Sequence, residues 1–302
     1  RKLAERIRDG EIDGLISMSS DPASNNDASV EAAVEKGIPV AGSGGTSMGQ
    51  ISTRRGNVIS ASGTTGTTNR TRAVAFISAF AKEFDLDYRP IIGATGAGTV
   101  EDSSPWKRIN FRGIMMAAMP AFIAMALLLA IGRIPGLDDW IIDLTGNESA
   151  SFSAMSSTII NLLPVIMAAI AAKQISGLDE IGIVAGIVAG ALSMGGGVIG
   201  GIVTGILAGV LVYYIASWLF RNKVPGTTVN ILAGSLAGIL AGLVGMFIIS
   251  PAALWIGDGI RMLIDSALGI SAPLAGLIAG LLIYPAIMGG VYHAAILPIV
   301  LL

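Results

Sequence analysis

Residues 273–302 read PLAGLIAGLLIYPAIMGGVYHAAILPIVLL and contain no Asp, Glu, Lys or Arg. This uncharged run is longer than the roughly 20 apolar residues that cross a bilayer, so we expect it to lie within a membrane. Pro285, Gly289, Gly290 and Pro298 interrupt it, and each weakens a helix by removing a backbone donor or loosening the backbone. The freed backbone groups need protein or water as partners, so the stretch predicts a polar cavity.

His293, the only histidine of the chain, lies between these helix-breaking residues. A titratable side chain in a membrane segment is costly to desolvate, which makes it a candidate for substrate binding. Its neutral ring has one donor and one acceptor, which suits neighbouring hydroxyl groups. Tyr292 and Tyr284 can offer a ring face, although interface anchoring also explains tyrosines. Asn161 is a further substrate-binding candidate, with helix-to-helix hydrogen bonding as the alternative.

The composition divides the chain into two parts. Charged residues make up 13% of the chain, against about 25% in soluble domains, and the mean hydropathy is +0.72. Residues 1–112 hold most of the charges, in balanced numbers, so the net charge of -2 favours no nucleic-acid partner. We expect a soluble domain over 1–88, a Gly- and Ser-rich linker over 89–105, and a membrane domain over 106–302. The chain starts at Arg and ends inside an apolar run, so we expect both ends to be cut from a longer protein.

The soluble part alternates between strand and helix patterns. Buried strands are expected at 14–19, 38–42 and 57–62, and helices at 28–36 and 68–84. This order predicts a parallel three-layer α/β domain.

Two polar loops, 43–47 and 62–69, follow predicted strands. Ligands bind at the carboxyl ends of strands in open α/β sheets, and helix N-termini attract anions. The second loop and the helix after it therefore form a candidate anion-binding site, made of Gly63, Thr64, Thr65, Gly66, Thr67 and Arg70. The alternative is that these residues only form turns and caps, because the loop matches neither the Walker pattern nor the dinucleotide fingerprint.

The second part of the chain predicts a polytopic α-helical membrane domain. Apolar segments are expected to span the bilayer at 114–131, 159–175, 181–195, 200–220 and 231–249. Cations cluster at 106–112, at Lys173 and at 221–223, whereas the loop 132–153 is acidic. The positive-inside rule then places the soluble domain in the cytoplasm.

Three of these spans repeat glycines at a spacing of four residues. The sets are Gly182, Gly186, Gly190; Gly201, Gly205, Gly209; and Gly234, Gly238, Gly242. This spacing puts each set on one helix face and predicts close helix-to-helix packing.

From Ile159 onward, the order of segments resembles the IIC permease domain of the bacterial sugar phosphotransferase system, in its glucose-type superfamily. The likeness is carried by five segments, 163–166, 168–171, 195–209, 248–251 and 289–298. The last, GGVYHAAILP, is similar to the family's Gly-x-His segment before a proline.

The resemblance implies a dimeric membrane domain that binds a sugar, carries it inward and presents it to a phosphorylated IIB domain. His293 would then be a sugar contact. The family's second substrate residue, a Glu in a Gly-Ile-Thr-Glu-Pro-like motif, has no counterpart before Leu302. The implied partners are a sugar, the bilayer, separate IIA and IIB proteins and a second copy of the chain. The implied location is the bacterial inner (cell) membrane.

The soluble part departs from this family pattern. The chain has no Cys, which excludes a phosphocysteine and thiolate metal ligands, and the soluble part has no His. We therefore expect no catalytic, metal or cofactor site here, and any phosphoryl group must come from another protein. Three hypotheses follow: a sugar permease, a membrane-anchored sensor or regulator whose α/β domain binds an anionic small molecule, and an ion-coupled carrier.

Overall fold

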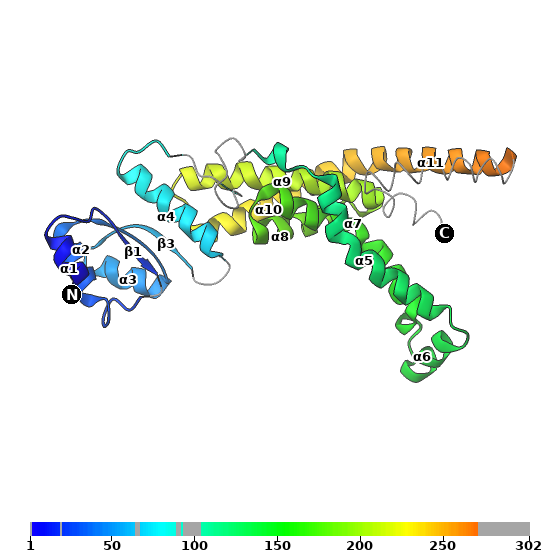
Figure 1. The fold of residues 1–302 in the computed structure, drawn as a ribbon, viewed down its shortest axis with the longest axis horizontal. Coiled ribbons are helices and arrows are strands. Elements are labelled where there is room, and N and C mark those ends of the chain that lie inside the picture. The colour runs from blue at the N-terminus through cyan, green and yellow to red at the C-terminus, as the bar shows by residue number, and fades with distance from the viewer. Residues whose placement is uncertain (1, 19, 64–66, 89–91, 93–103, 271–302) are drawn as a thin grey trace. The chain divides into compact units, whose positions relative to one another are not determined.

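The computed structural model describes residues 2–18, 20–63, 67–88, 92 and 104–270 (Figure 1). The chain forms two compact units. The first contains Arg1–Ser104 together with Val212–Gly234, and the second contains Pro105–Leu211 together with Ser235–Leu302. The predicted boundaries near residues 88 and 105 stay a prediction.

The first unit contains a parallel three-stranded sheet, which confirms the predicted α/β class. The strands are β1 (Leu15–Met18), β2 (Pro39–Ser43) and β3 (Asn57–Ser62), in the order β1-β2-β3. All five residues of β2 are buried, which is the pattern of a central strand covered on both faces. Because all strands run the same way, their carboxyl ends share one edge of the sheet.

Four helices accompany the sheet: α1 (Lys2–Arg8), α2 (Asp27–Lys36), α3 (Gly45–Thr53) and α4 (Asn69–Glu83). The predicted loop over 43–47 is wrong in part, because residues 45–47 form the first turn of α3. Gly44 makes this possible, since its φ of 101° turns the chain directly from β2 into the helix. Thr68 caps α4 by accepting a hydrogen bond from the Thr71 N–H at 3.2 Å.

The rest of the described chain is helical. The α-helices are α5 (Phe111–Gly132), α6 (Leu137–Thr145), α7 (Phe152–Ser176), α8 (Asp179–Leu192), α9 (Gly197–Arg221), α10 (Gly226–Val244) and α11 (Ser250–Ile270). The short elements are the 3-10 turns η2 (Pro105–Arg108), η3 (Glu148–Ala150) and η4 (Met194–Gly196), and the π-turn η5 (Gly245–Ile249).

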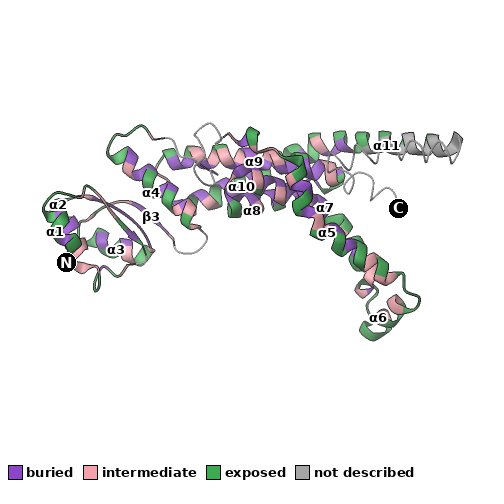
Figure 2. Cartoon of the chain, in the orientation of Figure 1, coloured by how far each residue is buried: buried purple, intermediate pink, exposed green. Residues whose placement is uncertain are grey.

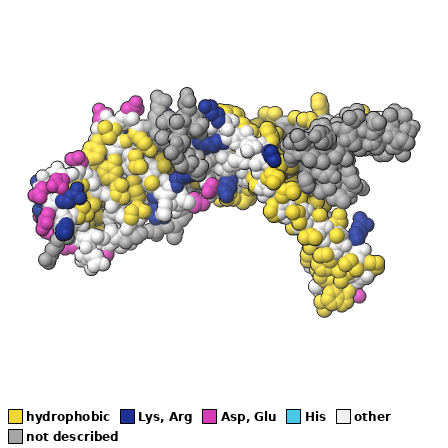
Figure 3. Space-filling model, in the orientation of Figure 1, with side chains coloured by type: hydrophobic (Ala, Val, Ile, Leu, Met, Phe, Trp, Pro, Cys, Tyr) yellow, Lys and Arg dark blue, Asp and Glu magenta, His cyan; other side chains and the backbone are white. Residues whose placement is uncertain are grey.

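Four stretches within the described residues are long and apolar enough to cross a bilayer. They are Phe111–Gly132, Phe152–Ser176, Met194–Arg221 and Gly226–Ile256. This confirms the polytopic helical prediction. Figure 3 shows hydrophobic side chains over much of α5 and α6. The span expected at 181–195 is shorter than a membrane span. Helix α8 has only 14 residues and is about 21 Å long, whereas a bilayer core is about 30 Å thick.

Close packing through glycine is confirmed in the second unit. A methyl group on Gly186 of α8, or on Gly205 of α9, would lie 2.5 Å from the carbonyl oxygen of Ala168 in α7. The backbone of α7 is therefore packed against the glycine faces of both α8 and α9. In α10, Gly238 approaches Ala185 of α8 in the same way, at 3.0 Å from its carbonyl oxygen. Figure 2 shows buried positions where these helices pack.

Candidate functional site

Two interruptions of the membrane helices lie against each other in the second unit. The 3-10 turn η4 separates α8 from α9, and the π-turn η5 joins α10 to α11. A methyl group on Gly196 of η4 would lie 2.9 Å from the Cα atom of Ser250, the first residue of α11. Such π-turns are frequent at functional sites.

Buried hydroxyl groups surround this junction of the two helix breaks. Ser250 Oγ donates a hydrogen bond to the Ser193 carbonyl oxygen at 3.2 Å, and Ser193 Oγ donates to the Ala189 carbonyl oxygen at 2.9 Å. Thr204 is fully buried, and its Oγ1 has no hydrogen-bond partner in the part of the chain that the structure describes. That oxygen would lie 2.8 Å from a methyl group on Gly245. The π-turn therefore faces a hydroxyl group with unused hydrogen-bonding capacity.

The junction brings together segments that are far apart in the sequence. Gly201 packs against the carbonyl group of Pro164, and Gly196 packs against Ser250. Segments 163–166, 195–209 and 248–251, which carry the family resemblance, thus meet here. Sequence reasoning did not single out the three hydroxyl residues. The sequence offers only a weak signal for them. Ser193 lies two residues before the run Gly195-Gly196-Gly197, and Ser250 directly precedes Pro251.

Three of the four predicted substrate-binding residues, His293, Tyr292 and Tyr284, lie outside the described residues. Asn161 lies on an exposed side of α7, next to the buried residues Leu163 and Pro164. An exposed amide on a membrane helix is available to a substrate or to a neighbouring helix. The grouping of these four residues stays a prediction.

The predicted anion-binding loop lies at the carboxyl end of β3, and its residues 64–66 lie outside the described residues. The Gly63 N–H donates to Thr227 Oγ1 at 2.9 Å, and Thr67 Oγ1 donates to the Gly63 carbonyl oxygen at 3.0 Å. The guanidinium of Arg72 donates to Asn69 Oδ1 at 3.0 Å. The amide of Gly63 is therefore already used by a threonine of α10.

The turn between α9 and α10 contacts the α/β domain at further points of the first unit. Lys223 Nζ lies 3.2 Å from Glu83 Oε2, at the end of α4. A methyl group on Gly226 would lie 3.2 Å from Ser62 Oγ. The hydrogen bond from Lys223, followed by that from Asn57, holds the pKa of Glu83 below its usual value. The α/β domain is thus fixed to this turn by both charge and packing.

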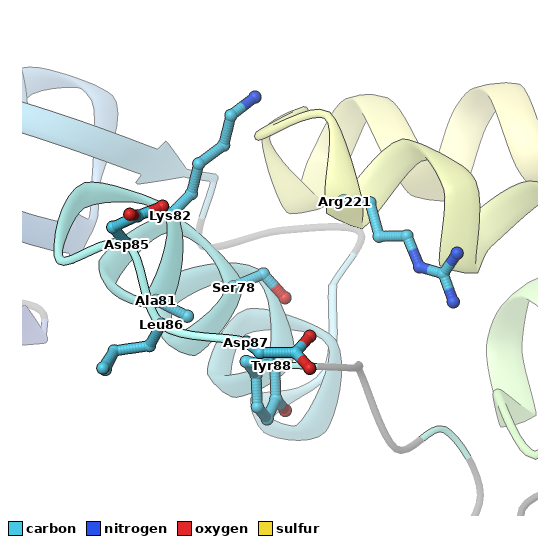
Figure 4. A pocket seen from close by; sticks show the side chains of 8 residues that line it. All are labelled: Ser78, Ala81, Lys82, Asp85, Leu86, Asp87, Tyr88 and Arg221. Atoms are coloured by element: carbon cyan, nitrogen blue, oxygen red, sulfur yellow. The ribbon is translucent and has the colours of Figure 1, made fainter.

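A cavity of about 210 Å³ opens beside the end of α4 (Figure 4). Ser78 lines it, and the Ser78 Oγ is buried without a hydrogen-bond partner among the described residues. The charged residues of its lining are two carboxylates and two cations, Asp85, Asp87, Lys82 and Arg221. Because these charges balance, the cavity does not favour an anion. Among the described residues, no group of three or more His, Asp or Glu side chains is placed to hold a metal ion.

Comparison with protein-family models identifies one family in this chain. The model of the phosphotransferase system EIIC domain matches residues 112–302, which is more than half of the 302 residues. Neither a curated protein nor a solved structure gives a match. EIIC domains are integral membrane permeases for sugars that work with IIA and IIB components, in agreement with the four membrane-length helices. The chain therefore belongs to the EIIC family of the phosphotransferase system.

Proposed function

We propose that this permease binds its sugar at segment 273–302, whose sequence is interrupted by proline and glycine, with His293 as a direct contact and Tyr292, Tyr284 and Asn161 beside it. The observation that carries the proposal is the family match, which extends over this segment. The two interrupted helices at η4 and η5 support it, because transporters build their substrate sites from discontinuous membrane helices.

Binding of labelled hexoses, hexitols and disaccharides to the full chain in proteoliposomes tests this assignment. We expect His293→Ala to weaken binding of the preferred sugar about fivefold, because one hydrogen bond is worth about 1 kcal/mol. Tyr214→Phe is the matched control, since Tyr214 is exposed on α9 and lies outside the proposed site. Unchanged affinity in His293→Ala would remove this residue from the site.

We also propose that the soluble domain faces the cytoplasm of a bacterium and that the permease is a homodimer in the inner membrane. Gln174 Nε2 donates to the Arg108 carbonyl oxygen at 2.8 Å, so the cations of η2 lie at the same end of α7 as Lys173. A gathering of cations at one end of the membrane helices supports this orientation. The chain has no Cys, so single cysteines at Asn222 and Thr145 can be labelled from each side of the membrane. We expect a membrane-impermeant maleimide to label Thr145→Cys, and not Asn222→Cys, in intact cells. The mass of the detergent-solubilised protein tests the dimer.

A regulatory role of the α/β domain is a second candidate function. It is supported by the hydrogen bond from the Gly63 N–H to Thr227 Oγ1, which joins the predicted anion-binding loop to a membrane helix. An anion at this loop would compete with Thr227 for the Gly63 amide. The ligand would then loosen the α9–α10 turn from the α/β domain.

Thermal-shift screening of the full chain against sugar phosphates, nucleotides and carboxylates tests the regulatory role. Thr227→Val keeps the side-chain size and removes the acceptor, so we expect it to strengthen binding of any such anion and to mimic its effect on uptake. Thr228→Val is the neighbouring control, because Thr228 is exposed. The regulatory role is wrong if no anion shifts the melting temperature and Thr227→Val leaves uptake unchanged.

A further inference from the structure

An apolar groove of about 470 Å³ lies between α7 and α8 in the second unit. Aliphatic side chains form its walls, and Ala169 leaves space between them. The one charged residue in its lining is Lys173, which forms no ion pair with any described residue. The groove is therefore an apolar channel with a cation at one end.

The length of the groove matches one leaflet of a bilayer. Its α7 wall runs from Leu162 to Lys173, eleven steps of about 1.5 Å, or about 17 Å. Half of the roughly 30 Å hydrocarbon core is about 15 Å. When the apolar wall lies in one leaflet, the ammonium group of Lys173 is thus at the level of the lipid headgroups.

Further cations lie at the same end of α7. The Arg108 guanidinium donates to the Ile175 carbonyl oxygen at 3.1 Å, which fixes η2 beside this helix end. Lys107 of η2 and Arg112 in the first turn of α5 are exposed. Opposing them are Asp179 and Glu180 in the first turn of α8, so the cations of this end still outnumber the carboxylates. The balance favours a negatively charged headgroup.

We propose that the groove binds an acyl chain of an anionic phospholipid, with the lipid phosphate on Lys173. A helix of a second protein copy is a poorer occupant, because a helix with side chains is about 10–12 Å wide and would bury the ammonium group against carbon. A lipid satisfies both ends of the groove at once: the chain covers the aliphatic walls and the phosphate pairs with the cation.

The test is the retention of lipid by the full chain. The protein is reconstituted in phosphatidylethanolamine vesicles with a minor fraction of phosphatidylglycerol, and retained lipids are counted by native mass spectrometry after mild extraction. A Lys or Arg near the membrane surface contributes about 1 kcal/mol to attraction of anionic lipid, so Lys173→Gln should lower the preference for phosphatidylglycerol about fivefold. Ala169→Trp fills the groove and should remove the retained lipid while Lys173 is still present.

Two matched variants separate the groove from general effects. Arg133→Gln removes an exposed cation at the other end of α5, and Val184→Trp adds a ring on the exposed surface of α8 outside the groove lining. Both should retain lipid like the unchanged protein. Lipid retention at the wild-type level in both Lys173→Gln and Ala169→Trp would overturn the proposal. Disulfide-linked dimers of an Ile166→Cys variant would also overturn it, because they would show a second copy of the chain at the groove. Lys173 is exposed, so the first variant stays informative if the tryptophan variant does not fold.

Discussion

Glu83 Oε2 lies 3.2 Å from Lys223 Nζ, so the last turn of α4 is ion-paired with the turn between α9 and α10. Both side chains are about one-third exposed or less. The pair fixes a soluble helix to a turn that connects two membrane-length stretches. With the bond between Gly63 and Thr227, it makes this turn part of the first compact unit.

Glu83→Gln should lower the stability of the first unit in a pH-dependent way. The pKa of Glu83 is lowered in the folded protein, so the pair stabilises the folded state at pH values above the unfolded-state pKa of about 4.3. This contribution disappears as the pH falls through the lower folded-state pKa. At neutral pH the loss should be at most about 1 kcal/mol, because solvent screens the pair. Thermal unfolding followed by tryptophan fluorescence, at pH 7 and below pH 4, measures this loss of stability. The difference from wild type should shrink in acid, and Glu148→Gln, which has no ion pair among the described residues, should show no such trend.

Gly186→Ala should destabilise the second unit by about 1–3 kcal/mol, because the added methyl group meets backbone atoms of α7 that cannot move away easily. It would lie 2.5 Å from the Ala168 carbonyl oxygen and 2.6 Å from the Ala169 Cα atom. Gly259→Ala is the matched control in α11, since no heavy atom lies within 4 Å of the added methyl group. Denaturation by added SDS compares the two variants. Equal stability would show that α7 and α8 do not depend on this close approach.

Thr204→Val should leave stability unchanged or raise it by about 1 kcal/mol. The substitution removes a buried hydroxyl group that has no partner among the described residues, and an unsatisfied buried polar group is costly. Ser250→Ala should instead lower stability by about 0.6 kcal/mol, because it removes the bond to the Ser193 carbonyl oxygen. Denaturation and sugar uptake are measured together. A stable Thr204→Val protein with reduced uptake would show that the hydroxyl group acts in transport, whereas a destabilised one would mean that it has a structural partner.

Asp138→Asn should lower the melting temperature at neutral pH more than Asp139→Asn does. Both residues lie in the first turn of α6, but Asp138 also accepts the Phe152 N–H at 2.9 Å and so holds the start of α7. A hydrogen bond from the Ser153 side chain, followed by the backbone N–H groups of Phe152 and Ser153, lowers the pKa of Asp138. Ionised Asp138 therefore stabilises the folded state above the unfolded-state pKa of about 3.9, and this contribution is lost as the pH falls through the lower folded-state pKa. Equal melting curves for the two variants at pH 7 would contradict this role of Asp138.

Local pattern was enough to predict much of the fold. Strand β3 has the predicted bounds 57–62, and α4 begins and ends within one residue of its predicted limits. These elements depend on the order of apolar and polar residues within a few turns. The glycine triplets also predicted that α8 and α9 pack closely against another helix, because a spacing of four puts the glycines on one helix face wherever the partner comes from. Helix α3 was not predicted at all, and its first turn was interpreted as a loop because Gly44, Gly45 and Ser47 suit a loop equally well.

The sequence by itself determined that a soluble α/β part precedes a helical membrane part, since hydrophobicity and its period are properties of each segment. Only the tertiary structure decided that the breaks at η4 and η5 meet around Thr204 and that Thr227 accepts from an amide 164 residues earlier. The physical reason is that a hydrogen bond or a close approach depends on two distant surfaces fitting each other. That fit is fixed by the packing of whole helices, and no single stretch of residues carries it.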